Sequence, residues 1–214
     1  MCEKLSQKKS TVPDDLVSVD DVLLLSETET SFFESLQRNF NEENITRIEN
    51  MTRGQSSNDA WYNFRKSVIT ASKCHEVLTK VKKLKNGAAN VSTFALNQKI
   101  LGNYFTSPDL PALKYGRAME VNAVNALFEV LKGQHKKLIF RDCGLFLDKE
   151  SPFVGATPDK LMSCECCSFA CVEVKCPYWI NYTTPQDGNL QYLVNENGSY
   201  KLKRQHQYFS QCQC

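Results

Sequence analysis

The sequence predicts a mixed α/β (α+β) fold with an N-terminal helical arm. Apolar residues recur at helical spacing as far as Lys132, three strand-like runs follow between Leu138 and Cys176, and one more amphipathic segment ends the chain. The 214 residues, of which 42% are hydrophobic and 23% charged, are typical of one globular domain with an arm. This composition excludes a fully disordered chain.

The sequence also indicates an intracellular protein, nuclear or cytoplasmic, rather than a secreted or membrane protein. No apolar run approaches the roughly 20 residues that span a bilayer. Residues 1–30 lack the apolar core and the cleavage site of a signal peptide. In an intracellular chain, the 10 cysteines are expected to be reduced thiols or metal ligands.

Charge is unevenly distributed along the chain, although the net charge is only +2. Residues 1–60 hold 6 Lys and Arg against 12 Asp and Glu, a local balance of −6. Residues 61–85 have a local balance of +6, because 7 basic residues face Glu76 alone, and this segment includes the basic run Lys80–Lys85. Such a run can contact phosphates, but a solvated helix face explains it equally well.

The first part of the chain is expected to be mainly helical. Residues 1–15 are polar and predict a loose tail, and apolar spacing predicts one helix from Asp20 to Phe40. The polar segment 41–59 contains a loop-like run at residues 54–58. A turn at Ile69, with Thr70 and Ser72 as N-cap residue types, predicts a helix that ends no later than Gly87. Further helices are predicted over residues 91–102 and over residues 115–132.

A β meander is expected after these helices, followed by a last helix. Strands are predicted over residues 138–147, 153–162 and 169–176, with Pro158 interrupting the second strand. Residues 200–214 predict a helix, and no stop signal precedes Cys214. We therefore expect the domain to continue past this residue.

Two acidic residues on neighbouring strands are the first candidates for chemistry. Glu173 and Lys175 share one face of the last strand, because strand side chains alternate between faces. Asp159 lies 14 residues before Glu173, so an antiparallel hairpin can bring the two carboxylates together. Carboxylates so close repel one another unless a divalent cation binds between them, and hard oxygen ligands favour Mg²⁺ or Mn²⁺.

Two helical residues are candidates to join these acids. Glu120 borders the apolar side of the helix predicted over 115–132, which suits an acid that faces the sheet. Gln205 shares a helical face with Phe209 and Cys212, so its amide is expected to point inward and to orient Lys175 or a water.

Four ordered segments resemble the motifs of the YqaJ viral recombinase/lambda-exonuclease-like family of PD-(D/E)XK nucleases. They are Ala60–Ser72, Tyr115–Glu120, Glu173–Pro177 and Gln205–Tyr208. Pro158-Asp159 followed by Glu173-Val174-Lys175 also matches the superfamily signature. The match covers residues 59–211, so we assign residues 1–50 to the arm and residues 51–214 to the nuclease domain.

The resemblance implies a restriction-endonuclease-like core, in which helices flank a mixed central sheet. It also implies a 5′-end-directed DNA exonuclease for recombination or repair, which hydrolyses phosphodiesters with two Mg²⁺ ions, or Mn²⁺ in their place. Duplex DNA ends are the implied partner, and the family also includes homo-oligomers. The implied residue roles are metal binding by Asp159, Glu173 and the Val174 carbonyl with help from Glu120, water activation by Lys175 with support from Gln205, and binding of a DNA 5′ phosphate by Arg65 and Ser72.

Two alternatives stay open. One is a non-catalytic nucleic-acid-binding module that keeps the nuclease fold. The other is a metal-binding protein that uses thiolates of the cysteine-rich turn, namely Cys164, Cys166, Cys167 and Cys171. Because adjacent cysteines at such tight spacing suit a tetrahedral site poorly, we expect free thiols there rather than Zn²⁺.

Overall fold

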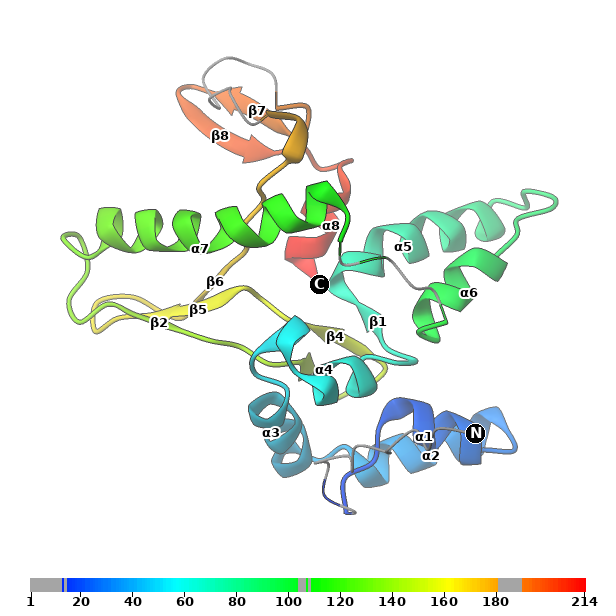
Figure 1. Ribbon diagram of the computed structural model, residues 1–214. Coiled ribbons are helices and arrows are strands. Elements are labelled where there is room, and N and C mark those ends of the chain that lie inside the picture. Colours follow the sequence, from blue (N-terminus) through cyan, green and yellow to red (C-terminus); the bar gives the residue numbers. More distant parts are fainter. Residues whose placement is uncertain (1–12, 14, 104–106, 108, 181–189) are drawn as a thin grey trace, which may run out of the picture.

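The computed structural model confirms a mixed α and β architecture (Figure 1). It describes residues 13, 15–103, 107, 109–180 and 190–214. The described helices are α1 (Val19–Leu25), α2 (Glu29–Asn39), α3 (Glu42–Met51), α4 (Asp59–Phe64), α5 (Ala71–Lys85), α6 (Phe94–Ile100), α7 (Pro111–Leu131) and α8 (Gln207–Gln213), with short 3₁₀ turns at Gln55–Ser57 and Tyr178–Ile180. The described strands are β1 (Ile69–Thr70), β2 (Ile139–Arg141), β3 (Phe146–Leu147), β4 (Val154–Ala156), β5 (Lys160–Ser163), β6 (Ala170–Val172), β7 (Leu193–Glu196) and β8 (Ser199–Leu202).

The described strands form two small three-stranded sheets and a separate hairpin. One sheet is mixed and has the order β1-β4-β3, with β1 parallel and β3 antiparallel to β4. The other is antiparallel and has the order β2-β5-β6, and β7 pairs with β8. Each of two predicted strands is therefore split between the sheets. Residues 138–147 contain β2 and β3 with a crossing at residues 142–145, and residues 153–162 contain β4 and most of β5 with a crossing at residues 157–159. The second crossing places Asp159 where the chain passes from one sheet to the other.

The N-terminal arm contains two helices where the sequence analysis predicted one, so that prediction was wrong. Capping explains the break. Thr28 begins α2 with its side chain accepting a hydrogen bond from the Ser31 backbone N–H, and Ser26 ends α1 in extended backbone. The loose tail predicted for residues 1–15 lies almost wholly outside the described residues.

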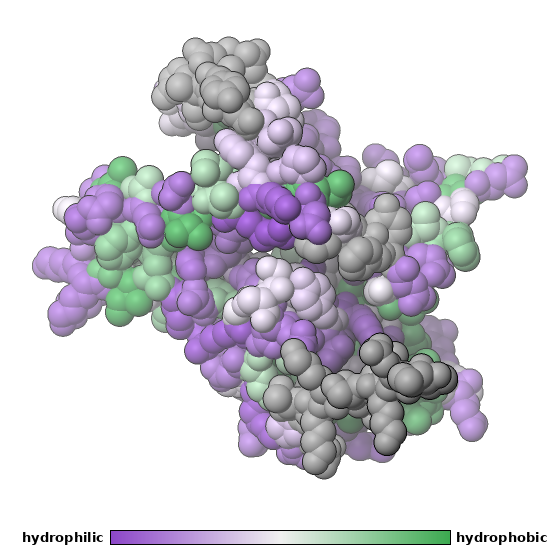
Figure 2. Space-filling model, viewed as in Figure 1, coloured by the Kyte–Doolittle hydropathy of each residue, from purple (hydrophilic) through white to green (hydrophobic). Residues whose placement is uncertain are grey.

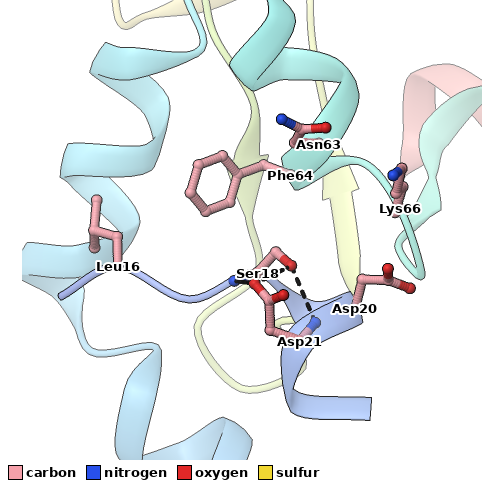
Figure 3. Close-up of a pocket in the computed structure, with 7 residues that line it drawn as sticks. All are labelled: Leu16, Ser18, Asp20, Asp21, Asn63, Phe64 and Lys66. Carbon is pink, nitrogen blue, oxygen red and sulfur yellow. Dashed lines mark hydrogen bonds between the residues drawn. The ribbon is translucent and has the colours of Figure 1, made fainter. Parts of the chain in front are cut away.

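Helix α1 and the segment before it pack against α4. Leu16, Val19 and Phe64 belong to one buried cluster that also includes Leu147 of β3. Beside this contact lies a pocket of about 220 Å³, where Ser18 caps α1 through Asp21 (Figure 3). The arm and the sheet are therefore held by a shared apolar core.

Helix α3 was missed by the sequence analysis, which found only a polar segment there. Its apolar positions are few, but Ile48 and the following Thr52 are fully buried. The Thr52 Oγ1 accepts a hydrogen bond from the backbone N–H of Leu145 at 2.7 Å. Contacts with the strand crossing at residues 142–145, rather than an apolar sequence pattern, therefore identify this helix.

Glu49 fixes the same crossing from α3. The residue is only 4% exposed, and its carboxylate accepts hydrogen bonds from Arg53 at 2.7 Å and from the backbone N–H of Gly144 at 3.1 Å. Arg141 lies 3.5 Å away. A Cβ at Gly144 would lie 1.9 Å from the Glu49 backbone oxygen, so this close approach requires glycine.

The last predicted helix, residues 200–214, is also partly wrong. Residues 199–202 form β8, because Asn197 and Gly198 have φ values of 54° and 83° and make a tight hairpin turn. Only residues 207–213 are helical. This short helix packs along α5, and His75 Nδ1 lies 2.9 Å from Ser210 Oγ.

Hydrophilic side chains cover much of the face in Figure 2, with apolar side chains gathered over the region of α7 and β2. Exposed apolar residues of these elements include Val121, Val130 and Ile139. Val121 is 60% exposed although it lies in the middle of α7. None of the described helices is both long and apolar enough to cross a membrane.

Candidate active site

The two acids predicted to meet do lie together, at the base of the β5–β6 hairpin. Lys160 pairs with Val172 in the antiparallel register, so Asp159 and Glu173 are the next residues along the two strands. The Asp159 carboxylate accepts a hydrogen bond from the backbone N–H of Val174 at 2.6 Å. Gln55 also holds the backbone next to Asp159, because its side-chain amide donates a hydrogen bond to the Pro158 carbonyl at 3.0 Å.

Glu120 approaches these acids from α7. It lines a pocket of about 250 Å³ together with Asp159. Burial raises the pKa of Glu120, and the charges of Asp159 and Glu173 raise it further, against smaller opposing effects of nearby lysines. The three carboxylates therefore share one electrostatic environment.

Glu173 is held by two donors. Lys175 Nζ and the Gln211 side-chain amide both hydrogen-bond its Oε1. Burial nevertheless raises the pKa of Glu173, and the opposing effect of Lys175 is too small to cancel it. Lys175 also lies over the ring of Tyr208, with Nζ 5.3 Å from the ring centre. The sequence prediction that Lys175 and Glu173 share a face agrees with this contact.

Gln205 does not take the place predicted for it. It is exposed in the turn before α8, whereas Gln211 on that helix reaches Glu173. The sequence analysis began the helix at residue 200 and so placed the wrong glutamine inward. The Asn197-Gly198 pair was the available signal, since it is typical of a hairpin turn and delays the helix.

Arg65 and Ser72 line a larger pocket of about 490 Å³ that also includes Asp159 and Glu173. The Arg65 guanidinium stacks on the Trp61 ring, with Cζ 3.8 Å from the ring centre. The Trp61 Nε1 in turn donates to Thr157 Oγ1 at 3.1 Å, so the platform is anchored beside Asp159. Arg65 is thereby held at the acid site by an aromatic ring rather than by a carboxylate.

Two cations near the start of α5 are largely withdrawn from water, namely Arg65, which lines this pocket, and Lys73. The Arg65 Nε is buried and has no hydrogen-bond partner among the described residues. Burial lowers the pKa of Arg65 to about 10. Burial also lowers the pKa of Lys73 to about 8, and the charge of Arg65 adds to this effect. An anion bound beside these two cations would raise both pKa values towards their usual range.

The basic run Lys80–Lys85 lies on the last turns of α5. Lys82, Lys83 and Lys85 are exposed, and Lys80 Nζ donates to the Ser92 carbonyl at 2.7 Å. Helix α5 starts at the pocket with Ser72 and carries these lysines away from it. A single helix thus connects the acid site to a basic surface.

The sequence of this chain is similar to those of viral nucleases. Residues 1–180 match the model of the viral alkaline exonuclease family. The chain is also 29% identical, over 171 residues, to the alkaline nuclease of Autographa californica nuclear polyhedrosis virus. That similarity covers 74% of this chain but 34% of the relative, so the chain spans about a third of the length of the curated relative it matches.

Proposed function

We propose that this chain, which belongs to the viral alkaline exonuclease family, is a metal-dependent deoxyribonuclease that digests DNA from 5′ ends in recombination or repair. The observation that carries the proposal is the meeting of Glu120, Asp159 and Glu173 beside a pocket that also contains Arg65. Acids that would bind a cation and cations that would bind a phosphate thus lie within one site. A nuclease needs both.

The donor set fits hard divalent cations. We assign Asp159, Glu173, Glu120 and the Val174 carbonyl as the groups that would hold Mg²⁺, with Mn²⁺ as a substitute. The raised pKa values of Glu120 and Glu173 support this fit, because a cation would favour their charged forms. When bound, a pair of such ions would acidify water and stabilise charge on the leaving oxygen.

Lys175 is the residue that we assign to the attacking water, either to orient it or to accept its proton. Its Nζ is already directed at the acid site by the contact with Glu173 and by the Tyr208 ring. We assign to Gln211 the supporting role that the sequence analysis gave to Gln205, because its amide hydrogen-bonds the same Glu173 oxygen as Lys175.

Arg65, with Ser72 and Lys73, would receive the 5′ phosphate of a DNA end. The buried Nε of Arg65 offers a donor that no described residue uses, and Ser72 lies in the first turn of α5, where free N–H groups attract anions. The phosphate would bind in the pocket that Asp159 and Glu173 also line. This arrangement would direct cleavage to bonds near the end.

The test is digestion of linear duplex DNA that carries either a 5′ phosphate or a 5′ hydroxyl, in Mg²⁺ and in EDTA. We expect loss of the phosphorylated strand in Mg²⁺ only, and none with Glu173→Ala. The matched control is Glu196→Ala, since Glu196 is an exposed acid that also pairs with a lysine. DNA binding without cleavage under all conditions would overturn the proposal in favour of a non-catalytic binding module.

A further inference from the structure

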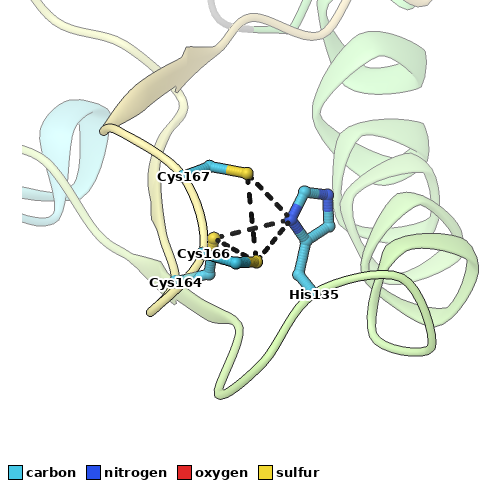
Figure 4. Close-up of side chains that lie close together, drawn as sticks. All are labelled: His135, Cys164, Cys166 and Cys167. Atoms are coloured by element: carbon cyan, nitrogen blue, oxygen red, sulfur yellow. Dashed lines mark hydrogen bonds between the residues drawn. The ribbon is translucent and has the colours of Figure 1, made fainter.

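A cluster of four metal-ligating side chains lies at the other end of the β5–β6 hairpin. His135 comes from the loop after α7, and Cys164, Cys166 and Cys167 come from the turn between β5 and β6 (Figure 4). Their ligand atoms all lie within 4.8 Å of one another. The cysteines are free thiols. From this geometry we infer a structural zinc site formed by His135, Cys164, Cys166 and Cys167.

The separations of the ligand atoms agree with a tetrahedral cage. Zn–S bonds of about 2.3 Å and Zn–N bonds of about 2.0 Å place tetrahedral ligands about 3.8 Å apart for two sulfurs and about 3.5 Å apart for sulfur and nitrogen. The His135 Nδ1 lies 3.4, 3.6 and 3.5 Å from the sulfurs of Cys164, Cys166 and Cys167. Cys166 Sγ lies 3.4 Å from Cys164 Sγ and 3.9 Å from Cys167 Sγ.

The ligand set differs from the one considered in the sequence analysis. Cys171 is exposed on β6, opposite Leu161, and is not part of the cluster. His135, which is 29 residues before Cys164, takes the fourth position. The adjacent Cys166 and Cys167 are compatible with one centre because the turn spreads their sulfurs to a tetrahedral separation. The expectation of free thiols rested on spacing alone.

The backbone around the cluster is already tied together. The Glu165 backbone N–H donates to the Lys136 carbonyl at 2.9 Å, and Lys137 forms an ion pair with Glu165. These contacts join the loop after α7 to the hairpin turn, so the four ligands are presented without a large rearrangement. A closed set of three thiolates and one imidazole selects zinc rather than the magnesium of the acid site.

A zinc ion here would clamp the end of α7 to the tip of the hairpin. The same helix carries Glu120, and the base of the same hairpin carries Asp159 and Glu173. Between these two places, the Phe128 ring of α7 packs edge-on against the Phe140 ring of β2, the strand that pairs with β5. The clamp would thus act on the relative position of the catalytic acids.

The test is the zinc content of the purified protein, measured by mass spectrometry after reduction and removal of loosely bound metal. We expect one zinc ion per chain in the unaltered protein and loss of it in Cys164→Ser and His135→Ala. Cys171→Ser is the matched control and should keep its zinc. An absence of zinc from the unaltered protein, or equal zinc in all variants, would overturn the inference.

A second measurement uses only the unaltered protein, so it does not depend on whether the variants fold. Cobalt bound to the unaltered protein should show the strong visible bands of a tetrahedral site and thiolate charge-transfer absorption. Zinc should displace this cobalt, and excess Mg²⁺ should leave it in place. Octahedral cobalt spectra, or displacement by Mg²⁺, would contradict a thiolate site. Both experiments are independent of nuclease activity.

Discussion

Burial affects Glu49, Glu120 and Glu173, but the pKa of Glu49 shifts in the opposite direction to the other two. Burial alone would raise the pKa of Glu49, but hydrogen bonds from Arg53 and Gly144 outweigh it and the pKa falls. For Glu120 and Glu173, burial prevails and the pKa rises. The difference lies in the partners: two arginines and a backbone N–H favour the charged form of Glu49, whereas burial outweighs the lysines near Glu120 and Glu173.

This contrast teaches how to separate a structural carboxylate from a functional one. Glu49 joins α3 to the strand crossing at residues 142–145, and its removal is expected to affect folding. Glu120 on α7 and Glu173 after β6 lie beside the next crossing, at residues 157–159, and their removal is expected to affect chemistry. Four variants test the contrast.

The largest effect is expected for Lys175→Ala. If Lys175 acts on the attacking water, its loss should lower the cleavage rate by about 10²-fold to 10⁴-fold, the usual contribution of a positioned proton-transfer group. DNA binding should be retained. Single-turnover cleavage and a filter-binding assay measure the two effects, and Lys201→Ala is the control, since Lys201 is exposed and pairs with Glu196. Undiminished cleavage by Lys175→Ala would refute the role.

The second prediction concerns Glu49→Ala. This change leaves the buried backbone N–H of Gly144 without its acceptor and should cost about 1–3 kcal/mol of unfolding free energy. Urea denaturation measures it, and Glu34→Ala on the exposed face of α2 is the control. A midpoint equal to that of the control variant would show that Glu49 is not needed for the fold.

The third prediction concerns Arg65→Ala. Loss of a charge-assisted hydrogen bond to phosphate should slow digestion of 5′-phosphorylated ends by roughly tenfold and spare 5′-hydroxyl ends. Rates on the two substrates are compared within one preparation, with Arg38→Ala as a surface control. Equal losses on both ends would contradict the phosphate pocket while leaving the acid site unaffected.

The smallest effect is a difference in pH dependence. A carboxyl group with a raised folded pKa binds more protons when folded, so the raised pKa values of Glu120 and Glu173 should lower stability as pH rises from about 4 towards 7. Glu49 acts in the opposite sense, and its contribution is lost only as pH falls below the ordinary carboxyl range.

Glu120→Gln should therefore raise the unfolding free energy near neutral pH in EDTA and weaken the stabilisation that Mg²⁺ gives. Thermal unfolding across this pH range, with and without Mg²⁺, measures both. Glu129→Gln lies on the same helix at an exposed position and serves as the control. A lower stability of Glu120→Gln at neutral pH in EDTA would show that Glu120 is a structural carboxylate like Glu49.

The sequence by itself determined the mixed α and β class and the pairing of Asp159 with Glu173. These follow from local rules, since helical spacing, strand alternation and a tight turn act over a few residues. It also indicated Lys175 beside Glu173. It failed at α3, whose polar sequence hides a helix that is stabilised by its docking.

Only the tertiary structure decided which distant groups meet. His135 joins the cysteines, Gln211 rather than Gln205 reaches Glu173, and Glu49 meets Gly144, which is 95 residues away in sequence. Each of these contacts depends on packing between segments far apart in the chain, and packing has no short-range signature. Local periodicity places a side chain on a face, but the elements packed against that face decide its partner.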